Sequence, residues 1–529
     1  MERGRNRCDC GGARVDHQWQ RVLAVEIRKR PIKRVLIANR GEIAVRIIRA
    51  CREMDIRAVS VFSDVDRKSL HALMADEAYP LFGSTPAQSY LNQDKILQLA
   101  RATGADAIHP GYGFLAENPS FARRVEEEGI KFIGPRSESI AMMGDKTEAR
   151  RTARNLGIPT VSGTEDPIRD ERDGLRSASD IGFPILLKAA AGGGGKGMRI
   201  VRSSEEFSSS FRAAQSEAKT AFGDERVYIE KYLDAPRHIE VQILADSYGN
   251  TIYLGERECS IQRRHQKVIE ESPSPAVDEK LRRTLGEAAV ALAKAARYEN
   301  AGTMEFLVDQ QHNFHFLEMN TRLQVEHPVT EATTGVDLVK EQIQVAEGRE
   351  LGFSQSDVRP RGHAIECRIC AEDPQNDFLP STGLLVRYQP PEGKIRVENG
   401  FRQGDEISVY YDSLLSKVIS WGATRDEAIA SMKRALSEFA IEGVKSTIPF
   451  CQFVLDHPAF RTGDFDTRFV ERHFKSATEE DRPEERRAAA ILAVLLAHHH
   501  QRLASFREHN GLPKAASQWK LLRREAFRS

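Results

Sequence analysis

Between Lys33 and about residue 145, short apolar segments alternate with segments that carry apolar residues at helical spacing. "RVLIAN" is followed by "GEIAVRIIRACREM", and "ADAIHP" is followed by a loop and "NPSFARRVEEEG". Strands that alternate with helices predict a parallel sheet covered by helices. This pattern constrains the fold more than any other feature of the chain, and it predicts a doubly wound α/β domain at 33–145.

The rest of the chain divides into further parts. "FPILLKAA", a glycine-rich segment and "RIVRS" predict strand, loop and strand. After them the pattern becomes β-rich and antiparallel, interrupted by a helix at 278–298. We therefore expect a second domain at 146–355 and a third, β-rich domain at 356–475. Residues 1–32 are a leader that we expect to be disordered, and a charged linker with a helical tail occupies 476–529.

Charge and composition exclude some classes of protein. Lysine and arginine together number 77, as do aspartate and glutamate, so the formal net charge is zero, which argues against a general nucleic-acid-binding protein. The longest apolar run, "AAAILAVLLA", is too short to span a bilayer. Seven scattered cysteines fit a reducing compartment. We expect a cytoplasmic protein without nucleic-acid or membrane partners; a transit peptide in the leader is the alternative.

The segment "GGGGKG" at 192–197 indicates a phosphate-binding loop. It is not a Walker A motif, because Ala190 precedes it and Lys196 is followed by glycine. Between two strands, these glycines would form a hairpin whose backbone N–H groups reach phosphates, with Lys188 and Lys196 beside them. An ordinary mobile turn is the alternative, but consecutive glycines lose much chain entropy when they are ordered, which argues against it.

A second glycine motif, "GYGFLA" at 111–116, matches G-x-G-x-x-A after a strand. A single match of this kind is a weak signal, and no acidic residue follows at the spacing of a dinucleotide site. We therefore do not expect dinucleotide binding here. The loop remains a candidate wall of the substrate site, with Tyr112 as the contact.

The segment "LEMNTRLQVEHPVTE" at 317–331 carries polar residues at every second position. In an extended chain these side chains would lie on one face: Glu318, Asn320, Arg322, Gln324 and Glu326. The segments around Glu305 and Glu318 are joined by "DQQHN" and predict a hairpin that brings both carboxylates together. With Asn320 they form an all-oxygen set that suits Mg²⁺ bound to nucleotide phosphates. A salt-bridged sheet face is the alternative.

The segment "QRRHQK" at 262–267 is strongly basic. Such a cluster is usually a solvated surface. Here it belongs to the same β-rich unit as the polar row, which favours an anion site. Arg322 would add a planar guanidinium for a carboxylate-like anion.

Taken in order, these motifs resemble biotin carboxylase, an ATP-grasp enzyme. The resemblance runs from about Lys33 to Phe474 and rests on "IANRGEIAVRIIRACRE", "AIHPGYGFLAEN", "KAAAGGGGKGMR", "EKYLDAPRHIEVQ", "ERECSIQRRHQKVIEE", "EMNTRLQVEHPVTE" and "RGHAIECRI". It implies a fold of the α/β and α+β classes. A Rossmann-like N-terminal domain would be followed by an ATP-grasp domain, with a glycine-rich lid at about 160–232, and a β-rich C-terminal domain.

The resemblance also implies roles for residues at matching positions. The catalytic residues would be Glu326, Arg368, Lys267 and Arg322. Bicarbonate would contact Lys267, Arg322, Gln324, Val325 and Glu326. Biotin would contact Tyr112, Gln262, His265 and Arg368. Mg²⁺ or Mn²⁺ would be held by Glu305, Glu318 and Asn320. ATP would contact Lys146, Lys188, Gly194, Gly195, Met198, Glu230, Lys231, Leu233, His238, His265 and Leu307.

In the reaction that the resemblance implies, Glu326 deprotonates bicarbonate, which attacks the γ-phosphate of ATP. The carboxyphosphate that forms splits into CO₂ and phosphate. That phosphate takes the ureido proton of biotin, Arg368 stabilises the enolate, and CO₂ adds to nitrogen.

The partners implied are separate chains. No "AMKM"-like biotin-attachment sequence occurs, and the Met–Lys pair in "SMKRA" lies in a predicted helix. We therefore expect biotin on a separate carrier protein and a separate carboxyltransferase, as in acyl-CoA carboxylases of the acetyl-CoA or propionyl-CoA type. The family resemblance also implies a homodimer, with Arg46 at the interface. We read the tail at 476–529 as an element that docks partner subunits.

Two other functions stay open from the sequence. Another ATP-grasp ligase, such as one that forms carbamoyl phosphate, would share the bicarbonate chemistry, although "QRRHQK" with "ECR" favours biotin. A non-catalytic scaffold would retain the fold alone. ATP hydrolysis that depends on both bicarbonate and biotin distinguishes the three.

Overall fold

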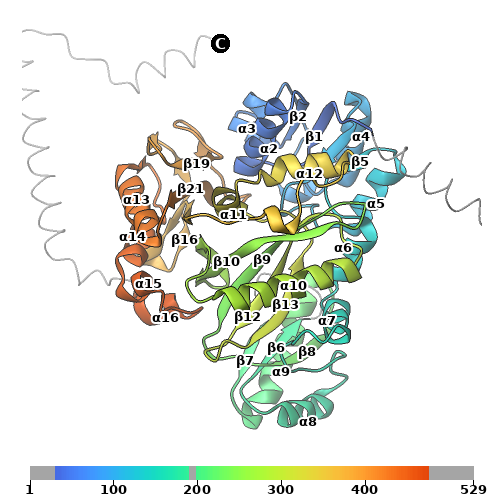
Figure 1. The fold of residues 1–529 in the computed structure, drawn as a ribbon, viewed down its shortest axis with the longest axis vertical. Coiled ribbons are helices and arrows are strands. Elements are labelled where there is room, and N and C mark those ends of the chain that lie inside the picture. The colour runs from blue at the N-terminus through green and yellow to red at the C-terminus, as the bar shows by residue number, and fades with distance from the viewer. Residues whose placement is uncertain (1–29, 190–197, 476–529) are drawn as a thin grey trace, which may run out of the picture. The chain divides into compact units, whose positions relative to one another are not determined.

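The structure, a computed structural model, describes residues 30–189 and 198–475 (Figure 1). Their elements fall into a parallel sheet near the N-terminus, a small sheet with two helices, and a large mixed unit around an eight-stranded sheet. Within the described ranges, none of the helices is long and apolar enough to cross a membrane.

The N-terminal part is the predicted parallel α/β sheet. Five strands lie in the order β3-β2-β1-β4-β5, and every neighbouring pair is parallel. Their bounds are β1 Arg34–Ile37, β2 Arg57–Phe62, β3 Glu77–Pro80, β4 Ala107–His109 and β5 Lys131–Phe132. The connecting helices are α2 Gly41–Glu53, α3 Leu70–Met74, α4 Gln93–Thr103, α5 Pro119–Glu127 and α6 Ser137–Gly144. The central strands are short, apolar and buried, as expected for strands covered on both faces.

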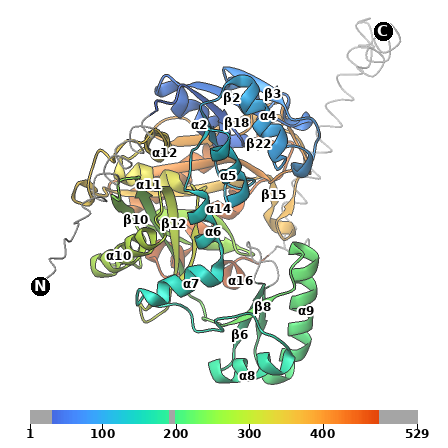
Figure 2. The ribbon, with the colours of Figure 1, turned by 90° about the vertical axis from the view of Figure 1, so that its right-hand side faces the viewer.

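A small three-stranded sheet, of order β7-β6-β8, projects from the rest of the fold (Figure 2). Its strands are β6 Ile185–Ala189, β7 Arg199–Val201 and β8 Val227–Lys231, and its helices are α8 Glu171–Ile181 and α9 Ser204–Phe222. It has an apolar core of its own, which includes Phe207 and Phe211. A separate core allows these elements to act as one body, as the lid predicted at about 160–232 would require, and we call β6 to β8 with α8 and α9 the predicted lid. The predicted strand–glycines–strand pattern is confirmed as β6 and β7, and the glycines between them lie outside the described residues.

The eight-stranded sheet has the order β13-β12-β9-β10-β11-β14-β21-β19, and all its neighbours are antiparallel. The bounds are β9 Arg237–Ala245, β10 Thr251–Arg263, β11 Gln266–Ser272, β12 Asn300–Val308, β13 Phe314–Asn320, β14 His363–Cys370, β19 Arg396–Asn399 and β21 Leu414–Gly422. The pairing of β11 with β14 joins strands that are about 90 residues apart in sequence, since Glu271 is the register partner of Ile365. The third predicted domain therefore shares one sheet with the second.

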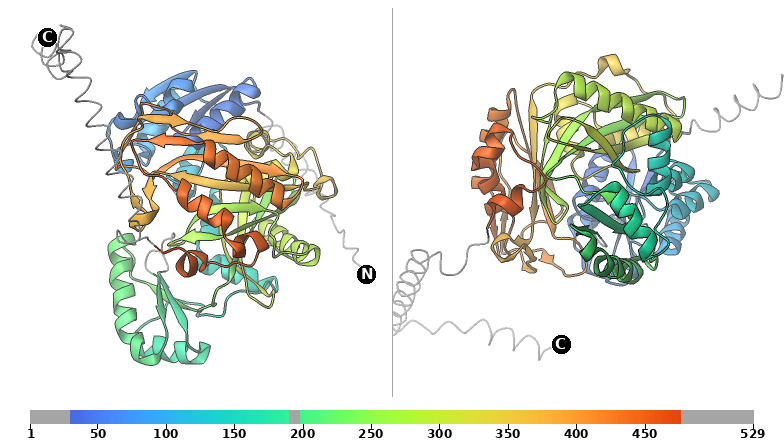
Figure 3. Two further views of the ribbon diagram at one scale, coloured as in Figure 1. Left: turned by 90° about the vertical axis from the view of Figure 1, so that its left-hand side faces the viewer. Right: turned by 90° about the horizontal axis from the view of Figure 1, so that it is seen from below.

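Helices cover this sheet on both sides. α7 Lys146–Asn155 and α10 Glu279–Ala295 pack with β9, β12 and β13 around one apolar core, and α11 His327–Thr334 and α12 Leu338–Ala346 follow β13. α13 Arg425–Glu438 packs over β14 and β21 (Figure 3). α14 Ile448–Asp456 packs on α13, α15 Pro458–Thr462 on α14, and α16 Phe469–His473 on β10, all around one apolar core. Short strand pairs complete this part: β15 Glu372–Asp373 with β16 Leu379–Pro380, β17 Gly383–Leu384 with β20 Glu406–Ile407, and β18 Arg387–Gln389 with β22 Ala440–Glu442.

Candidate active site

The predicted hairpin of β12 and β13 is confirmed. Glu305 on β12 is the register partner of Glu318 on β13, so the two side chains leave the same face of the sheet at neighbouring positions. Asn320 Nδ2 donates to Glu305 Oε1 at 2.6 Å. The donors are carboxylate and amide oxygens on two rigid strands, and this set fits a hard divalent cation such as Mg²⁺.

The predicted extended row is only partly correct. β13 ends at Asn320, and 321–326 form an irregular segment that turns into α11. Pro328 lies in the first turn of α11, a position that favours a helix start. The turn carries Glu326 away from a straight line and into the interior, where it is 1% exposed. The tertiary turn, rather than strand periodicity, places the far half of the row.

Lys267 contacts three carboxylates of the site. Its Nζ lies 3.0 Å from Glu305 Oε1 and 2.9 Å from Glu326 Oε1, and it also contacts Glu240. Burial alone would lower the pKa of Lys267, but the carboxylates of Glu305 and Glu326 outweigh it, and the pKa is raised. The ammonium therefore stays charged and holds three carboxylates from β9, β12 and the loop before α11.

Glu326 is held from two sides. Its Oε2 accepts from Arg368 Nη2 at 2.9 Å, while Oε1 faces Lys267. Burial would raise the pKa of Glu326, but Lys267, Arg368 and Arg257 lower it well below the usual value. Glu326 is therefore an ionised carboxylate throughout the neutral range, as a proton acceptor must be.

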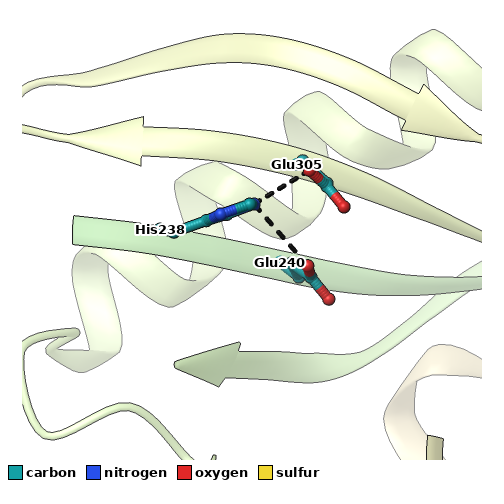
Figure 4. Close-up of side chains that lie close together, drawn as sticks. All are labelled: His238, Glu240 and Glu305. Atoms are coloured by element: carbon teal, nitrogen blue, oxygen red, sulfur yellow. Dashed lines mark hydrogen bonds and ion pairs between the residues drawn. The ribbon is translucent and has the colours of Figure 1, made fainter. Parts of the chain in front are cut away.

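Glu240 was not predicted from the sequence. It is fully buried on β9 beside His238, and both face Glu305 (Figure 4). His238 Nε2 lies 2.9 Å from Glu305 Oε2 and 3.6 Å from Glu240 Oε1. A signal was available, because His238, Glu240 and Gln242 are polar at every second position of an otherwise apolar strand.

Arg257 was also missed. It is fully buried on β10 and donates from Nη2 to Gln324 at 2.6 Å and from Nη1 to Gln242 at 2.8 Å. Gln324 in turn donates to Glu305 Oε1 at 2.9 Å. Arg257 therefore fixes the irregular segment that follows β13, and Lys417 adds a second anchor by donating to the carbonyl of Val325 at 2.7 Å.

The two candidate anion-binding arginines lie on either side of this centre. Arg368 on β14 donates from Nε to Glu270 at 2.6 Å. Arg322 donates from Nε to Glu117 at 2.8 Å and from Nη2 to Asn320 at 3.0 Å. Both guanidinium groups are thus oriented by a carboxylate and retain further N–H groups for an anion.

A second cluster lies toward the lid. Lys146 Nζ is 3.0 Å from Glu318, so this lysine joins the hairpin to α7. Glu230 on β8 is buried between Lys188, which it contacts, and Arg150 Nη1 at 2.6 Å. A cavity of about 220 Å³ opens beside α7, lined by Lys146, Arg150, Thr164, Glu165 and Tyr228 among others. Lys188, Glu230 and Glu318 do not line it, so the cavity adjoins this cluster rather than containing it.

The remaining candidate residues lie around these two clusters. Gln262 Nε2 donates to His238 Nδ1 at 2.7 Å, and Leu307 on β12 is the register partner of His238. Lys231 Nζ donates to the carbonyl of Gly182 at 2.9 Å, at the base of the lid. Met198 and Leu233 are half-buried, and His265 is exposed in the β10–β11 turn with a φ of 65°. Gly194 and Gly195 lie outside the described residues.

Tyr112 is tied to Glu42 by its hydroxyl group. Burial, with the charge of Glu42, raises the pKa of Tyr112 well above its usual value, so the hydroxyl stays protonated. Arg46 also has partners within the chain, because Nη2 lies 3.1 Å from Glu331 and 2.5 Å from Asp337.

Comparisons with known proteins agree with this arrangement. Three family models match consecutive segments: "Biotin carboxylase, N-terminal domain" at 31–140, "Carbamoyl-phosphate synthase L chain, ATP binding domain" at 145–353, and "Biotin carboxylase C-terminal domain" at 366–472. Biotin carboxylase 1 of Bacillus subtilis is 54% identical over 444 residues, which are 84% of this chain and 99% of that protein. The chain belongs to the biotin carboxylase family.

Other relatives are parts of larger carboxylases. The propionyl-CoA carboxylase alpha chain of Ruegeria pomeroyi is 50% identical over 84% of this chain and 69% of its own length. The biotin carboxylase domain dimer of 2-oxoglutarate carboxylase from Hydrogenobacter thermophilus, solved with MgADP, ADP and bicarbonate, superposes with a TM-score of 0.83 at 49% identity. The match covers 85% of this chain and all of that one. Membership of the biotin carboxylase family makes this chain an ATP-grasp ligase that uses ATP and Mg²⁺ to carboxylate biotin.

Proposed function

We propose that this chain carboxylates carrier-bound biotin, with bicarbonate activated at Glu326 and biotin received at Arg368. The observation that carries the proposal is the placement of one ionised carboxylate, Glu326, between Lys267 and Arg368. A base that is clamped by two cations from different strands is positioned to meet an anion and to remove its proton.

The first step activates bicarbonate. Lys267, Arg322 and the backbone at Val325 would hold the anion, and Glu326 would take its proton. Because Lys267 and Arg368 stabilise the ionised form of Glu326, the base is available at neutral pH. The deprotonated anion then attacks the γ-phosphate of ATP, which yields carboxyphosphate and ADP.

ATP would lie between the lid and the β12–β13 hairpin. Lys146 and Lys188 would neutralise its phosphates. Glu230 on β8 orients Lys188 and is itself held by Arg150 of α7. Mg²⁺, bound by Glu305, Glu318 and Asn320, would supply further positive charge at the phosphates. The lid would exclude water from the short-lived carboxyphosphate.

The last step transfers CO₂ to biotin. Carboxyphosphate releases CO₂ and phosphate, the phosphate takes the ureido proton, and the enolate that forms is stabilised by Arg368. Arg368 is held in place by Glu270 and Glu326, so its guanidinium is directed before biotin arrives. Tyr112, Gln262 and His265 would line the approach of biotin.

ADP release measured with Mg-ATP and bicarbonate, with and without free biotin, tests this function. We expect biotin to stimulate ADP release, and Glu326→Gln to lose the biotin-dependent rate by about 10²-fold or more, since general-base catalysis contributes about that much. Glu279→Gln, an exposed site at the start of α10, is the matched control and should keep the wild-type rate. ATP hydrolysis that does not respond to biotin would instead indicate a different ATP-grasp reaction.

The partners belong to the same proposal. Relatives of this chain are biotin carboxylases or carboxylase alpha chains, and one solved relative is a domain dimer. We propose that this chain forms a homodimer and works with a biotin carrier protein and a carboxyltransferase, with an acyl-CoA as the acceptor. Cytoplasmic location and docking of partners by 476–529 remain predictions from the sequence.

A further inference from the structure

Behind Arg368 lie two acidic residues that the proposed chemistry does not use. Glu270 on β11 and Glu366 on β14 are register partners on adjacent antiparallel strands. Both residues are fully buried, with no measurable exposure to solvent. Side chains at such positions lie side by side on one face of the sheet, so the two carboxyl groups are neighbours in the interior.

Their hydrogen bonds are unequal. Glu270 Oε1 accepts from Arg368 Nε at 2.6 Å, whereas Glu270 Oε2 has no donor among the described residues. Neither oxygen of Glu366 has a hydrogen-bond partner within 30–189 and 198–475. A buried carboxylate without a donor is unstable as an anion, and a proton shared by two neighbouring carboxyl groups removes that instability.

The charge around the site leads to the same conclusion. Five buried carboxylates are gathered near three cations, Arg257, Lys267 and Arg368. The carboxylates are Glu240, Glu270, Glu305, Glu326 and Glu366. Four of the five contact at least one of these cations, and Glu366 contacts none of them. Glu366 is therefore the carboxyl group of this set that a proton would stabilise most.

Among the described residues, none of the cations that face Glu366 forms an ion pair with its carboxyl group. From β21, Lys417 donates to the carbonyl of Val325 and lies 3.2 Å from Glu42. Burial raises the pKa of Glu366 well above its usual value, and the charges of Glu270 and Glu326 add to this rise against the opposing Lys417 and Arg368.

The helix that packs on the same strands, α11, offers Glu366 no cation either. Burial holds the pKa of His327 on α11 well below its usual value, so its imidazole is neutral. Glu331 on the same helix is engaged by Arg46 and Arg396.

We propose that Glu366 is a protonated carboxylic acid that donates a hydrogen bond to Glu270 Oε2, and that this pair positions Arg368 for the biotin step. The proposal rests on the proposed function. In this arrangement Glu366 keeps Glu270 as an oriented anion, Glu270 holds the guanidinium of Arg368, and Arg368 meets Glu326. Glu366 is thus a positioning residue that acts through Glu270.

Infrared difference spectroscopy of the full chain at neutral pH tests the protonation directly. We expect the C=O stretch of a protonated carboxylic acid, sensitive to exchange into D₂O, to disappear in Glu366→Gln. In Glu270→Gln the band should remain and shift, because Glu366 keeps its proton and donates to the new amide oxygen. If Glu366→Gln removes no such band, the proposal is wrong, whatever the enzymatic activity turns out to be.

Kinetics of two substitutions test the positioning role. Glutamine at 366 retains an N–H donor for Glu270, whereas leucine of similar size does not. We expect the biotin-dependent rate of Glu366→Leu to be lower than that of Glu366→Gln by about tenfold, the usual consequence of leaving a buried acceptor without its donor. KM for ATP should be the same in both variants.

Equal biotin-dependent rates in two folded variants, or a parallel change in KM for ATP, would contradict the positioning role. If Glu366→Leu does not fold, the infrared result decides. Failure of the proposed function looks different, because the wild-type chain itself would then show no response of ADP release to biotin.

Discussion

At the residue scale, the site gathers buried carboxylates around a few cations that they share. Lys267 holds Glu240, Glu305 and Glu326 together, and Arg368 joins Glu326 to Glu270. Ion pairs of this kind are costly to break, because the partner that is left behind becomes an uncompensated buried charge. Removing one member of these contacts would therefore destabilise the fold as well as disturb Glu326.

The pH dependence of stability should report this coupling. The pKa of Glu326 in the folded chain lies well below its unfolded value of about 4.3. Its contribution to the free energy of unfolding is therefore complete above that value and is lost as the pH falls toward the folded pKa. We expect Glu326→Gln to lose less stability than wild type as the pH falls from about 5 to about 3, measured by urea unfolding. Parallel pH profiles of the two proteins would contradict this prediction.

At the element scale, the base of the lid depends on one glycine. The segment around Gly163 runs along β8, where Thr164 N donates to the carbonyl of Ile229 at 2.9 Å and Gly163 forms a bridge to Glu230. A Cβ at Gly163 would overlap the Ile229 carbonyl oxygen and lie 3.0 Å from Arg150 Nη2. The close approach of two backbones leaves no room for a side chain.

Gly163→Ala should therefore destabilise the lid and weaken ATP binding. Overpacking of this kind costs about 1–3 kcal/mol, and the displaced backbone carries Glu230, which orients Lys188. Gly144→Ala, at the end of α6, is the matched control, since a Cβ there meets no atom within 4 Å. The urea midpoint and the Kd for ATP should both change in Gly163→Ala, and neither should change in Gly144→Ala. A variant at Gly163 with the stability of the control would refute the argument.

At the scale of the whole molecule, the eight-stranded sheet joins the ATP-grasp strands to the C-terminal strands through the β11–β14 pair. We call the β11–β14 pair the seam of the sheet. Glu270 and Glu366 are register partners at this seam, and Arg368 of β14 contacts Glu326 on the other side of it. The active site is thus assembled from both sides of the seam and requires the sheet to be continuous.

Because the sheet is continuous, we predict that its strands unfold together in one cooperative step. We expect the amides of β9, β12, β14 and β21 to exchange with solvent deuterium with the same free energy, because strands in one ladder lose their partners together. The amides of β6 and β8, which belong to the small sheet with its own core, should exchange with a lower free energy. Exchange of β14 and β21 at a lower free energy than β9 and β12 would show that the two parts unfold separately.

Local patterns in the sequence determined much of this protein. The strand–helix alternation predicted the parallel sheet, and the segment around "DQQHN" predicted the hairpin that pairs Glu305 with Glu318. Both follow from periodicity and turn chemistry, which act over a few residues. The motifs that resemble biotin carboxylase predicted the family, which the comparisons confirm.

Only the tertiary structure decided which buried side chains lie in contact with one another around Lys267 and Arg368. The expected row does not continue along β13, and a turn before α11 places Glu326 against residues from β11 and β14. Glu240 is brought beside Glu305 by the pairing of β9 with β12, and Glu366 beside Glu270 by the pairing of β11 with β14. Arg257 faces Glu240 across the neighbouring strands β9 and β10 and reaches Gln324 far along the chain. A local pattern shows that a strand has a polar face, but the identity of the charges opposite that face is fixed by the order and register of the sheet.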